Sequence, residues 1–178
     1  MIYFTSDTHF NHANIIKFCA RPFASVEEMN TVLIQNWNSR VTNDDEIYIL
    51  GDFSYKGSSA DVNRLLSRLN GKKYLIRGNH DTFIDNEDFD KTAFEWIKDY
   101  YLLNYQKTKI VLFHYPIFEW DGYFNSSIHL YGHVHNCGKH IEQVKRLTAM
   151  DKRAINVGVD VNDYFPVSIQ TVLQRALS

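Results

Sequence analysis

Short apolar runs, rich in β-branched and aromatic side chains, recur along the chain and end at polar or turn-forming residues. This pattern is typical of strands buried in a sheet. The predicted strands are Ile2 to Ser6, Glu46 to Leu50, Tyr74 to Arg77, Lys109 to Phe113, Ile128 to Tyr131, Ala154 to Val157 and Val167 to Thr171.

Helical spacing of apolar residues appears between the early strands. The segment Ser25 to Glu28 has the form of a capping box, and Met29, Leu33 and Trp37 continue its apolar face at helical spacing. A second helix is expected to begin at Ser58 or Ser59 and to end at Gly71. Strands alternating with helices, followed by strands with short connections, predict a layered α/β sandwich with a mixed sheet.

Length and charge narrow the class of protein. A chain of 178 residues fits one domain, residues 1–178, and a domain of this size buries roughly 70% of the surface that its unfolded chain exposes. The formal net charge is −2, which gives no sign of the basic stripe typical of nucleic-acid binding. A small basic patch remains compatible with this charge.

The cysteines and the first residues indicate a cytoplasmic protein. Cys19 and Cys137 lie far apart in sequence without a paired motif, so we expect reduced, structurally idle thiols. The stretch Met1 to Phe10 does not resemble a secretory signal, and no apolar run reaches the length of a transmembrane helix.

Candidate metal ligands follow several of the predicted strands. They occur in the pieces Asp7-Thr8-His9, Gly51-Asp52, Gly78-Asn79-His80-Asp81, His114 and Gly132-His133-Val134-His135. In open α/β sheets, ligands bind beyond the carboxyl ends of the strands, so these pieces are expected to gather there. Each piece alone is more often a helix cap or a loop hydrogen-bonding group.

The spacing within two pieces indicates chelation. If the strand Ile2 to Ser6 continues through His9, Asp7 and His9 project from one face and can bind one cation. His133 and His135 repeat this spacing. Carboxylate, imidazole and amide donors suit Mn, Fe, Zn, Ni or Co, and neither cysteine is needed.

The order D-x-H, G-D, G-N-H-D, H, G-H-x-H resembles the calcineurin-like metallophosphoesterase superfamily over residues 7–135. The segments Asp7 to Phe23 and Asn156 to Val161 resemble its small single-domain bacterial and phage members. This resemblance implies a layered α/β sandwich of mixed sheets flanked by helices. It also implies two divalent metal ions, Mn(II) first, with Fe, Zn, Ni or Co as alternatives.

The resemblance assigns a role to each matching residue. Ligands of one metal ion would be Asp7, His9 and His135, and ligands of the other would be Asn79, His114 and His133. Asp52 would bridge the two ions. His80 resembles the catalytic histidine that protonates the leaving group, and Asp81 resembles the carboxylate that orients it.

The function implied is hydrolysis of a phosphodiester, with a nucleotide-type substrate open, by a hydroxide held between the two metals. A phosphomonoesterase and a non-catalytic metal-binding scaffold protein of the same fold are the alternatives. After Gly51-Asp52 the chain lacks the second Asp and the Arg of many phosphatases of this superfamily. This departure disfavours a phosphoprotein phosphatase, although Lys56 could supply a charge.

Three further residues are predicted to bind substrate phosphate. His12 and Asn14 follow the first metal-ligand piece in a turn at the rim of the site, and Arg21 offers a fork of donors suited to phosphate. His140 is expected to be exposed beyond the metal ligands. The predicted partner is a small phosphoester, without membrane association, and the oligomeric state stays open.

Overall fold

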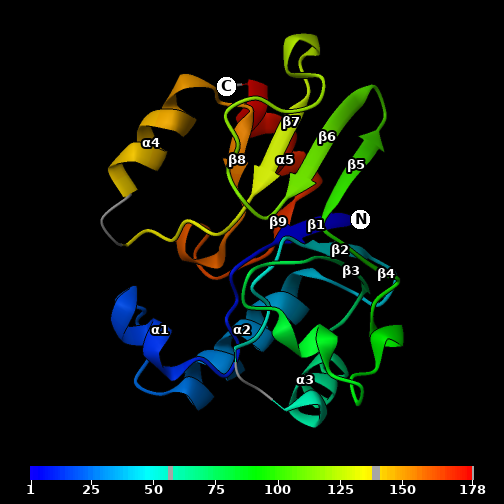
Figure 1. The fold of residues 1–178 in the computed structure, drawn as a ribbon, viewed down its shortest axis with the longest axis vertical. Coiled ribbons are helices and arrows are strands. Elements are labelled where there is room, and N and C mark those ends of the chain that lie inside the picture. The colour runs from blue at the N-terminus through cyan, green and yellow to red at the C-terminus, as the bar shows by residue number, and fades with distance from the viewer. Residues whose placement is uncertain (56–57, 138–140, 178) are drawn as a thin grey trace.

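The fold comes from a computed structural model, which describes residues 1–55, 58–137 and 141–177. The predictions for Lys56 and His140 lie outside these described residues. Two mixed sheets form the centre of the molecule, with helices around them (Figure 1). This arrangement confirms the predicted layered α/β sandwich.

The first sheet has the strand order β4-β3-β2-β1-β9. Its strands are β1 (Ile2–Thr5), β2 (Glu46–Ile49), β3 (Lys72–Ile76), β4 (Trp96–Lys98) and β9 (Val167–Ser168). Strands β1 to β4 run parallel, and β9 pairs antiparallel with β1. Parallel strands end at one edge of the sheet, so the loops after β1, β2 and β3 lie side by side.

The second sheet has the strand order β5-β6-β7-β8. Its strands are β5 (Tyr100–Tyr105), β6 (Thr108–Phe113), β7 (Ile128–Tyr131) and β8 (Ala154–Asn156). Strands β6, β7 and β8 run parallel, and β5 pairs antiparallel with β6. The residues that follow β6, β7 and β8 therefore also meet at one edge.

The helices are α1 (Ala13–Phe18), α2 (Val26–Arg40), α3 (Ser59–Leu66), α4 (Ile141–Met150) and α5 (Ile169–Leu177). Short 3-10 helices span Thr82–Asp85, Lys91–Ala93, Tyr123–Asn125 and Val159–Val161. Helices α1, α2 and α3 lie on the first-sheet side of the molecule, and α4 lies beside β8 at the edge of the second sheet (Figure 1).

Strand β2 shows why the molecule has two cores. Ile47 and Ile49 point into the core shared with α2 and α3, whereas Tyr48 and the following Leu50 point into the core between the two sheets. Successive side chains of a strand face opposite sides, so an unbroken apolar run buries both faces. The first sheet is therefore the middle layer of the sandwich.

The predicted capping box begins α2. The Ser25 hydroxyl accepts a hydrogen bond from the Glu28 amide at 3.2 Å, and the Glu28 carboxylate accepts one from the Ala24 amide at 2.6 Å. Met29, Leu33 and Trp37 are buried on the face turned to the core. The prediction of this helix is confirmed, and α3 begins after Ser58, as predicted.

Three predictions of secondary structure are wrong. The helix expected to end at Gly71 is α3, which ends at Leu66. The run Val167 to Thr171 is a strand only through Ser168, because the Ser168 hydroxyl caps α5 by accepting a hydrogen bond from the Thr171 amide at 3.2 Å. The second half also contains β5 and α4, where only strands with short connections were expected.

A disulfide joins Cys19 and Cys137, with their Cα atoms 5.1 Å apart. Cys19 caps the end of α1, and Cys137 follows the loop that leaves β7. The prediction of idle thiols is therefore wrong, because contacts made only in the folded molecule bring two cysteines 118 residues apart together. Within the described ranges, the chain forms no helix that is both long and apolar enough to cross a bilayer.

Candidate metal centre

The two sheets meet at the edge where their parallel strands end. The Asp7 amide donates to the Gly51 carbonyl at 3.0 Å, and the Gly132 amide donates to the His114 carbonyl at 2.9 Å. Ser6 pairs with Gly158 in a bridge between the sheets, with the Val159 amide donating to the Ser6 carbonyl at 3.0 Å. All the predicted metal ligands lie in or beside these connected loops.

Left-handed backbone conformations turn four of the candidate ligands into the site. Asp7, His9, Asp52 and His133 have φ values of 56°, 48°, 54° and 66°. Non-glycine residues seldom adopt such values, and they concentrate at functional sites. The strand prediction for Asp7 and His9 is therefore wrong, because β1 ends at Thr5 and tight turns aim both side chains.

Glycines allow the loops to approach closely. Gly51 has a φ of 90°, and a Cβ atom there would collide with the His114 imidazole. A Cβ on Gly132 would collide with the Ser6 hydroxyl and the Asp7 carboxylate. Both positions need glycine for the two sheets to bring their ligands together.

The first group of candidate ligands is Asp7, His9 and His135, each with a ligand atom within 4.8 Å of the others. His135 Nε2 lies 4.0 Å from Asp7 Oδ1. The His133 amide donates to both Asp7 oxygens at 3.0 Å, which fixes the carboxylate. This first group combines carboxylate and imidazole donors from both sheets.

The second group is Asp52, His114 and His133, again with ligand atoms within 4.8 Å of one another. Asn79 joins it, because its Oδ1 lies 3.1 Å from His114 Nε2 and 3.0 Å from His133 Nδ1. The Leu50 carbonyl accepts from His114 Nδ1 at 2.7 Å, which leaves Nε2 to face the site.

Asp52 lies between the two groups. Its Oδ2 is 3.5 Å from His9 Nε2 of the first group and 3.6 Å from His114 Nε2 of the second. Its Oδ1 accepts a hydrogen bond from the His80 amide at 2.8 Å. A carboxylate in this place can serve both groups at once.

His80 stands beside Asp52 and is open to solvent. Its side chain is 39% exposed, and its Nε2 lies 4.0 Å from Asp52 Oδ2. It is not part of either group of candidate metal ligands. An imidazole here can reach a bound ester without being a ligand.

Asp81 has a different task from the one predicted. Its buried carboxylate accepts hydrogen bonds from the amides of Gly78, Asp52 and Phe53 at 2.8–2.9 Å. No described hydrogen bond joins Asp81 to the His80 ring, so the predicted orienting role is wrong. Asp81 instead ties the loop after β3 to the loop after β2, and it positions Asp52.

The structure also contradicts the prediction that Arg21 binds substrate phosphate. Its side chain is 0% exposed. The guanidinium donates to both Asp160 oxygens at 2.8 and 2.9 Å and to the carbonyls of Asp7 and Thr8 at 2.8 and 2.9 Å. Arg21 holds the first metal-ligand loop in place, and its donors are occupied.

Asp160 is a residue that sequence reasoning missed. Its Oδ2 accepts a hydrogen bond from His135 Nδ1 at 2.6 Å, which leaves His135 Nε2 to face Asp7. The segment Asn156 to Val161 carried a signal only as a family resemblance. Its contact with His135 depends on the fold, 25 residues away along the chain.

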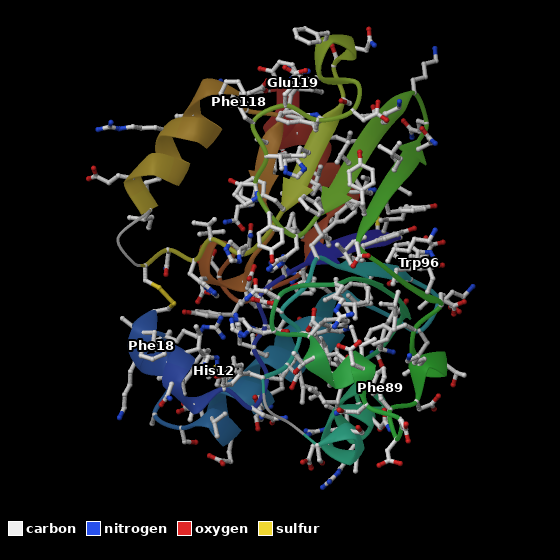
Figure 2. The ribbon with its side chains drawn as sticks, in the orientation of Figure 1. His12, Phe18, Phe89, Trp96, Phe118 and Glu119 are labelled. Carbon is white, nitrogen blue, oxygen red and sulfur yellow. A yellow bond between two sulfur atoms is a disulfide. The ribbon has the colours of Figure 1, made fainter. Side chains whose placement is uncertain are left out.

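His12 is buried beside His9, and Asn14 is exposed nearby in α1. The His12 Nδ1 is 3.4 Å from His9 Nδ1, and its ring stacks on Tyr55 with centroids 3.9 Å apart. Figure 2 shows His12 beside Phe18. Substrate contact by His12 or Asn14 stays a prediction.

Burial controls the charge of the ligands. Desolvation lowers the pKa of His9 and of His133, so both imidazoles are neutral and able to donate a lone pair. Burial raises the pKa of Asp7 to about 6. Burial is the largest single influence on His135 and opposes its charge, but the hydrogen bond to Asp160 and the negative charges of Asp7 and Asp160 together outweigh burial and raise the pKa of His135.

These residues fit divalent metal ions. Asp7 and Asp52 are buried carboxylates, and the neutral imidazoles of His9 and His133 cannot balance their charge. His9 Nε2 is buried and makes no hydrogen bond within the described part of the chain. An orphaned nitrogen facing a carboxylate is the environment that a bound cation would satisfy.

Known proteins resemble this chain over nearly its whole length. A model of the calcineurin-like phosphoesterase family matches residues 1–105. The chain is 40% identical to the uncharacterized protein MJ1445 of Methanocaldococcus jannaschii over 174 residues, which are 97% of this chain and 89% of that protein. It is 28% identical to the gene 66 protein of Mycobacterium phage D29 over 93% of this chain and 92% of that protein.

A solved structure resembles the whole chain. The protein of unknown function AQ665 from Aquifex aeolicus superposes with a TM-score of 0.72 and 28% sequence identity, covering 98% of each chain. The two proteins thus share one fold over nearly the full length of both chains.

Proposed function

Because the chain belongs to the calcineurin-like phosphoesterase family, we propose that it hydrolyses phosphodiesters with two divalent metal ions at the centre described above. The observation that carries the proposal is the position of Asp52 Oδ2. This oxygen lies within 3.6 Å of an imidazole nitrogen from each ligand group. A shared carboxylate between two ligand sets is the arrangement a dinuclear centre requires.

Each ion would have its own ligands. Asp7, His9 and His135 would hold one, Asn79, His114 and His133 would hold the other, and Asp52 would be shared. When bound, divalent ions supply Lewis acidity and lower the pKa of a coordinated water. The mixed oxygen and nitrogen donors favour Mn(II) as the first metal to test, with Fe, Zn, Ni and Co next.

His80 would act on the leaving group. Its exposed imidazole can give a proton to the departing oxygen of an ester bound beside Asp52, because its Nε2 lies 4.0 Å from Asp52 Oδ2. General acid catalysis of this kind contributes about 10²- to 10⁴-fold to the rate. The hydrogen bond from the His80 backbone amide to Asp52 Oδ1 keeps His80 next to the carboxylate that would be shared.

The internal hydrogen bonds of Arg21 support a phosphodiester over a phosphomonoester as the substrate. A phosphomonoester dianion carries one more negative charge than a diester, and an arginine fork suits such a group. Arg21 is buried, with its donors on Asp160 and on backbone carbonyls. The Arg21 guanidinium therefore stabilises the loop after β1 and has no donor left for a substrate phosphate.

The test is hydrolysis of an aryl phosphodiester and of the matching monoester by metal-stripped protein, with and without Mn(II). We expect diester cleavage that depends on metal and exceeds monoester cleavage. In Asp52→Asn the shared charge is reduced, so we expect loss of at least one bound metal and of activity. Two metals still bound in this variant would contradict the shared ligand.

His80→Ala separates an enzyme from a scaffold protein. We expect it to lower the turnover number by about 10²-fold or more while its metal content stays the same, because His80 is outside both ligand groups. Loss of metal in this variant would indicate that His80 is a metal ligand and would contradict its role as an acid outside the ligand groups. No turnover of either ester by the wild-type protein, with two metals bound, would favour the scaffold alternative.

A further inference from the structure

A row of aromatic rings leads away from the second group of candidate ligands. Tyr115 follows His114, which is the first residue after β6, and it is 36% exposed. The ring centroids of Tyr115 and Phe113 are 5.5 Å apart, and those of Phe113 and Tyr100 are 6.1 Å apart. Tyr100, at the start of β5, is 40% exposed. Tyr115, Phe113 and Tyr100 together form the aromatic strip.

The pairing of β5 with β6 places the strip on the outer face of the second sheet. Tyr100 is paired with Phe113 across these two neighbouring strands (Figure 1), and cross-strand partners point to the same face. Leu112 of β6 is buried in the core between the two sheets, so the next residue, Phe113, points to the other face. Tyr115 continues the row through its ring contact with Phe113. The strip therefore lies outside that core, half-buried at Phe113 and exposed at both ends.

Tyr115 joins the strip to the candidate metal centre. Its ring centroid lies 4.8 Å from that of His114 and 4.6 Å from that of His133. Its hydroxyl oxygen lies 3.5 Å from Asn79 Oδ1. The Tyr115 backbone is held as well, because its carbonyl accepts a hydrogen bond from His129 Nε2 at 3.2 Å. One exposed ring thus contacts the second ligand group and begins the strip.

We propose that the aromatic strip binds a flat aromatic group of the phosphodiester, the group that stays on the phosphate when water cleaves the other ester bond. This inference rests on the proposed function and adds its substrate class, a diester with an aromatic ester group. His80, the proposed acid for the leaving group, packs on His9 of the first ligand group with centroids 5.4 Å apart. Tyr115 packs on His133 of the second group. The retained ester group is therefore assigned to the strip.

Aromatic rings distinguish a flat ligand from an aliphatic one of similar size. Offset-stacked and edge-to-face ring pairs add to the free energy gained by burying apolar area, which corresponds to about 2- to 10-fold in affinity. Exposed apolar patches on soluble proteins often mark ligand sites. The strip therefore predicts a preference for a phenyl over a cyclohexyl ester group.

The kinetic test compares phenyl 4-nitrophenyl phosphate with cyclohexyl 4-nitrophenyl phosphate on protein loaded with Mn(II). Both diesters carry one negative charge and release 4-nitrophenolate, so they differ in the retained group alone. Their intrinsic reactivities are the same for every variant, so a change in the ratio of their kcat/KM values reports on the protein. Tyr115→Leu should lower the phenyl-to-cyclohexyl ratio by about 2- to 10-fold. Tyr115→Phe keeps the ring without the hydroxyl and should preserve the wild-type ratio.

Phe118→Leu is the matched control. Phe118 is an aromatic residue in the loop after Tyr115 and is 67% exposed. Among the described residues, no ring contact joins Phe118 to the strip. This variant should keep the wild-type ratio. An equal fall in Phe118→Leu and Tyr115→Leu, or an unchanged ratio in Tyr115→Leu, would overturn the proposal.

Binding of diphenyl phosphate and dicyclohexyl phosphate, measured by isothermal titration calorimetry on the same proteins, tests the strip without turnover. We expect Tyr115→Leu to raise the Kd of diphenyl phosphate about 2- to 10-fold more than that of dicyclohexyl phosphate, and Phe118→Leu to raise neither. Hydrolysis of both 4-nitrophenyl diesters without any dependence on Tyr115 would overturn the strip and leave the proposed function standing. If neither diester is hydrolysed, the proposed function fails, and the calorimetric comparison still decides whether the strip binds aromatic groups.

Discussion

At the scale of single residues, the candidate metal centre depends on carboxylates that hold its loops and ligands in place. Asp81 is buried and accepts three backbone hydrogen bonds that join the loops after β2 and β3. Burial raises its pKa to about 6, because desolvation outweighs those three bonds. The position of Asp52, the proposed shared ligand, therefore relies on the buried carboxylate of Asp81.

Asp81→Asn is predicted to destabilise the fold. The new amide group would place a donor against backbone donors, and an unsatisfied buried polar group costs about 1–3 kcal/mol. We expect the free energy of unfolding to fall by that amount in urea denaturation, together with weaker metal binding. Asp85→Asn is the control, since Asp85 is exposed in the same loop. An equal effect in both variants would contradict the anchoring role.

Asp160→Asn is predicted to weaken metal binding by the first group. The carboxylate fixes the His135 tautomer through a 2.6 Å hydrogen bond, and loss of such partners typically costs 10- to 100-fold in metal affinity, so we expect a loss of about that size. Competition with a chelator measures it. Asp163→Asn, at an exposed position nearby, should leave the affinity unchanged. Unaltered affinity in Asp160→Asn would contradict this role.

Sequence reasoning located the ligand loops because each follows an apolar run. It could not identify Asp160 as a site residue, and it could not show that Arg21 is used internally. Arg21 and Asp160 contact each other across 139 positions of sequence, so their pairing depends on the fold. Asp81 was misassigned for a related reason: its neighbour in sequence is His80, but its carboxylate turns to the loop after β2.

At the scale of elements, α2 shows how local signals fix a boundary. Ser25 and Glu28 satisfy backbone donors at its start, and the sequence predicted this helix correctly. Strand β5 was missed because its turn to β6 contains Gln106 with a φ of 52° and no glycine. Strand β4 is only three residues long, too short for a periodic signal.

Ser25→Ala is predicted to destabilise α2. Loss of an N-cap serine costs about 1 kcal/mol, and the amide of Glu28 would lose its acceptor. The change should appear as a lower free energy of unfolding in urea. Ser39→Ala, an exposed serine in the last turn of the same helix, is the control and should change stability less. Equal losses would contradict the capping role.

At the scale of the whole molecule, the disulfide joins the end of α1 to the loop that carries His135. It closes a long segment of chain, because Cys19 and Cys137 are separated by 118 positions in the sequence. Such a link limits the freedom of the unfolded chain, and it also ties the first-sheet side of the molecule to the second sheet close to the metal centre.

Reduction is predicted to destabilise the protein. Disulfides typically contribute about 2–4 kcal/mol, so we expect a loss of that size when wild-type protein is denatured with a reductant. Cys19→Ser should show the same loss and no further effect of reductant. Titration of the unreduced, denatured wild-type protein should detect no free thiol. Two free thiols in that experiment would contradict the link.

The division of the ligands between the sheets has a consequence for synthesis of the chain. Asp7, His9, Asp52 and Asn79 leave the ribosome well before His114, His133 and His135. A nascent chain can thus fold much of the first sheet and still lack a complete set of donors for either group of candidate ligands. If the proposed function holds, metal loading reports that synthesis has passed β7, and a prematurely terminated fragment lacks the proposed hydrolytic centre.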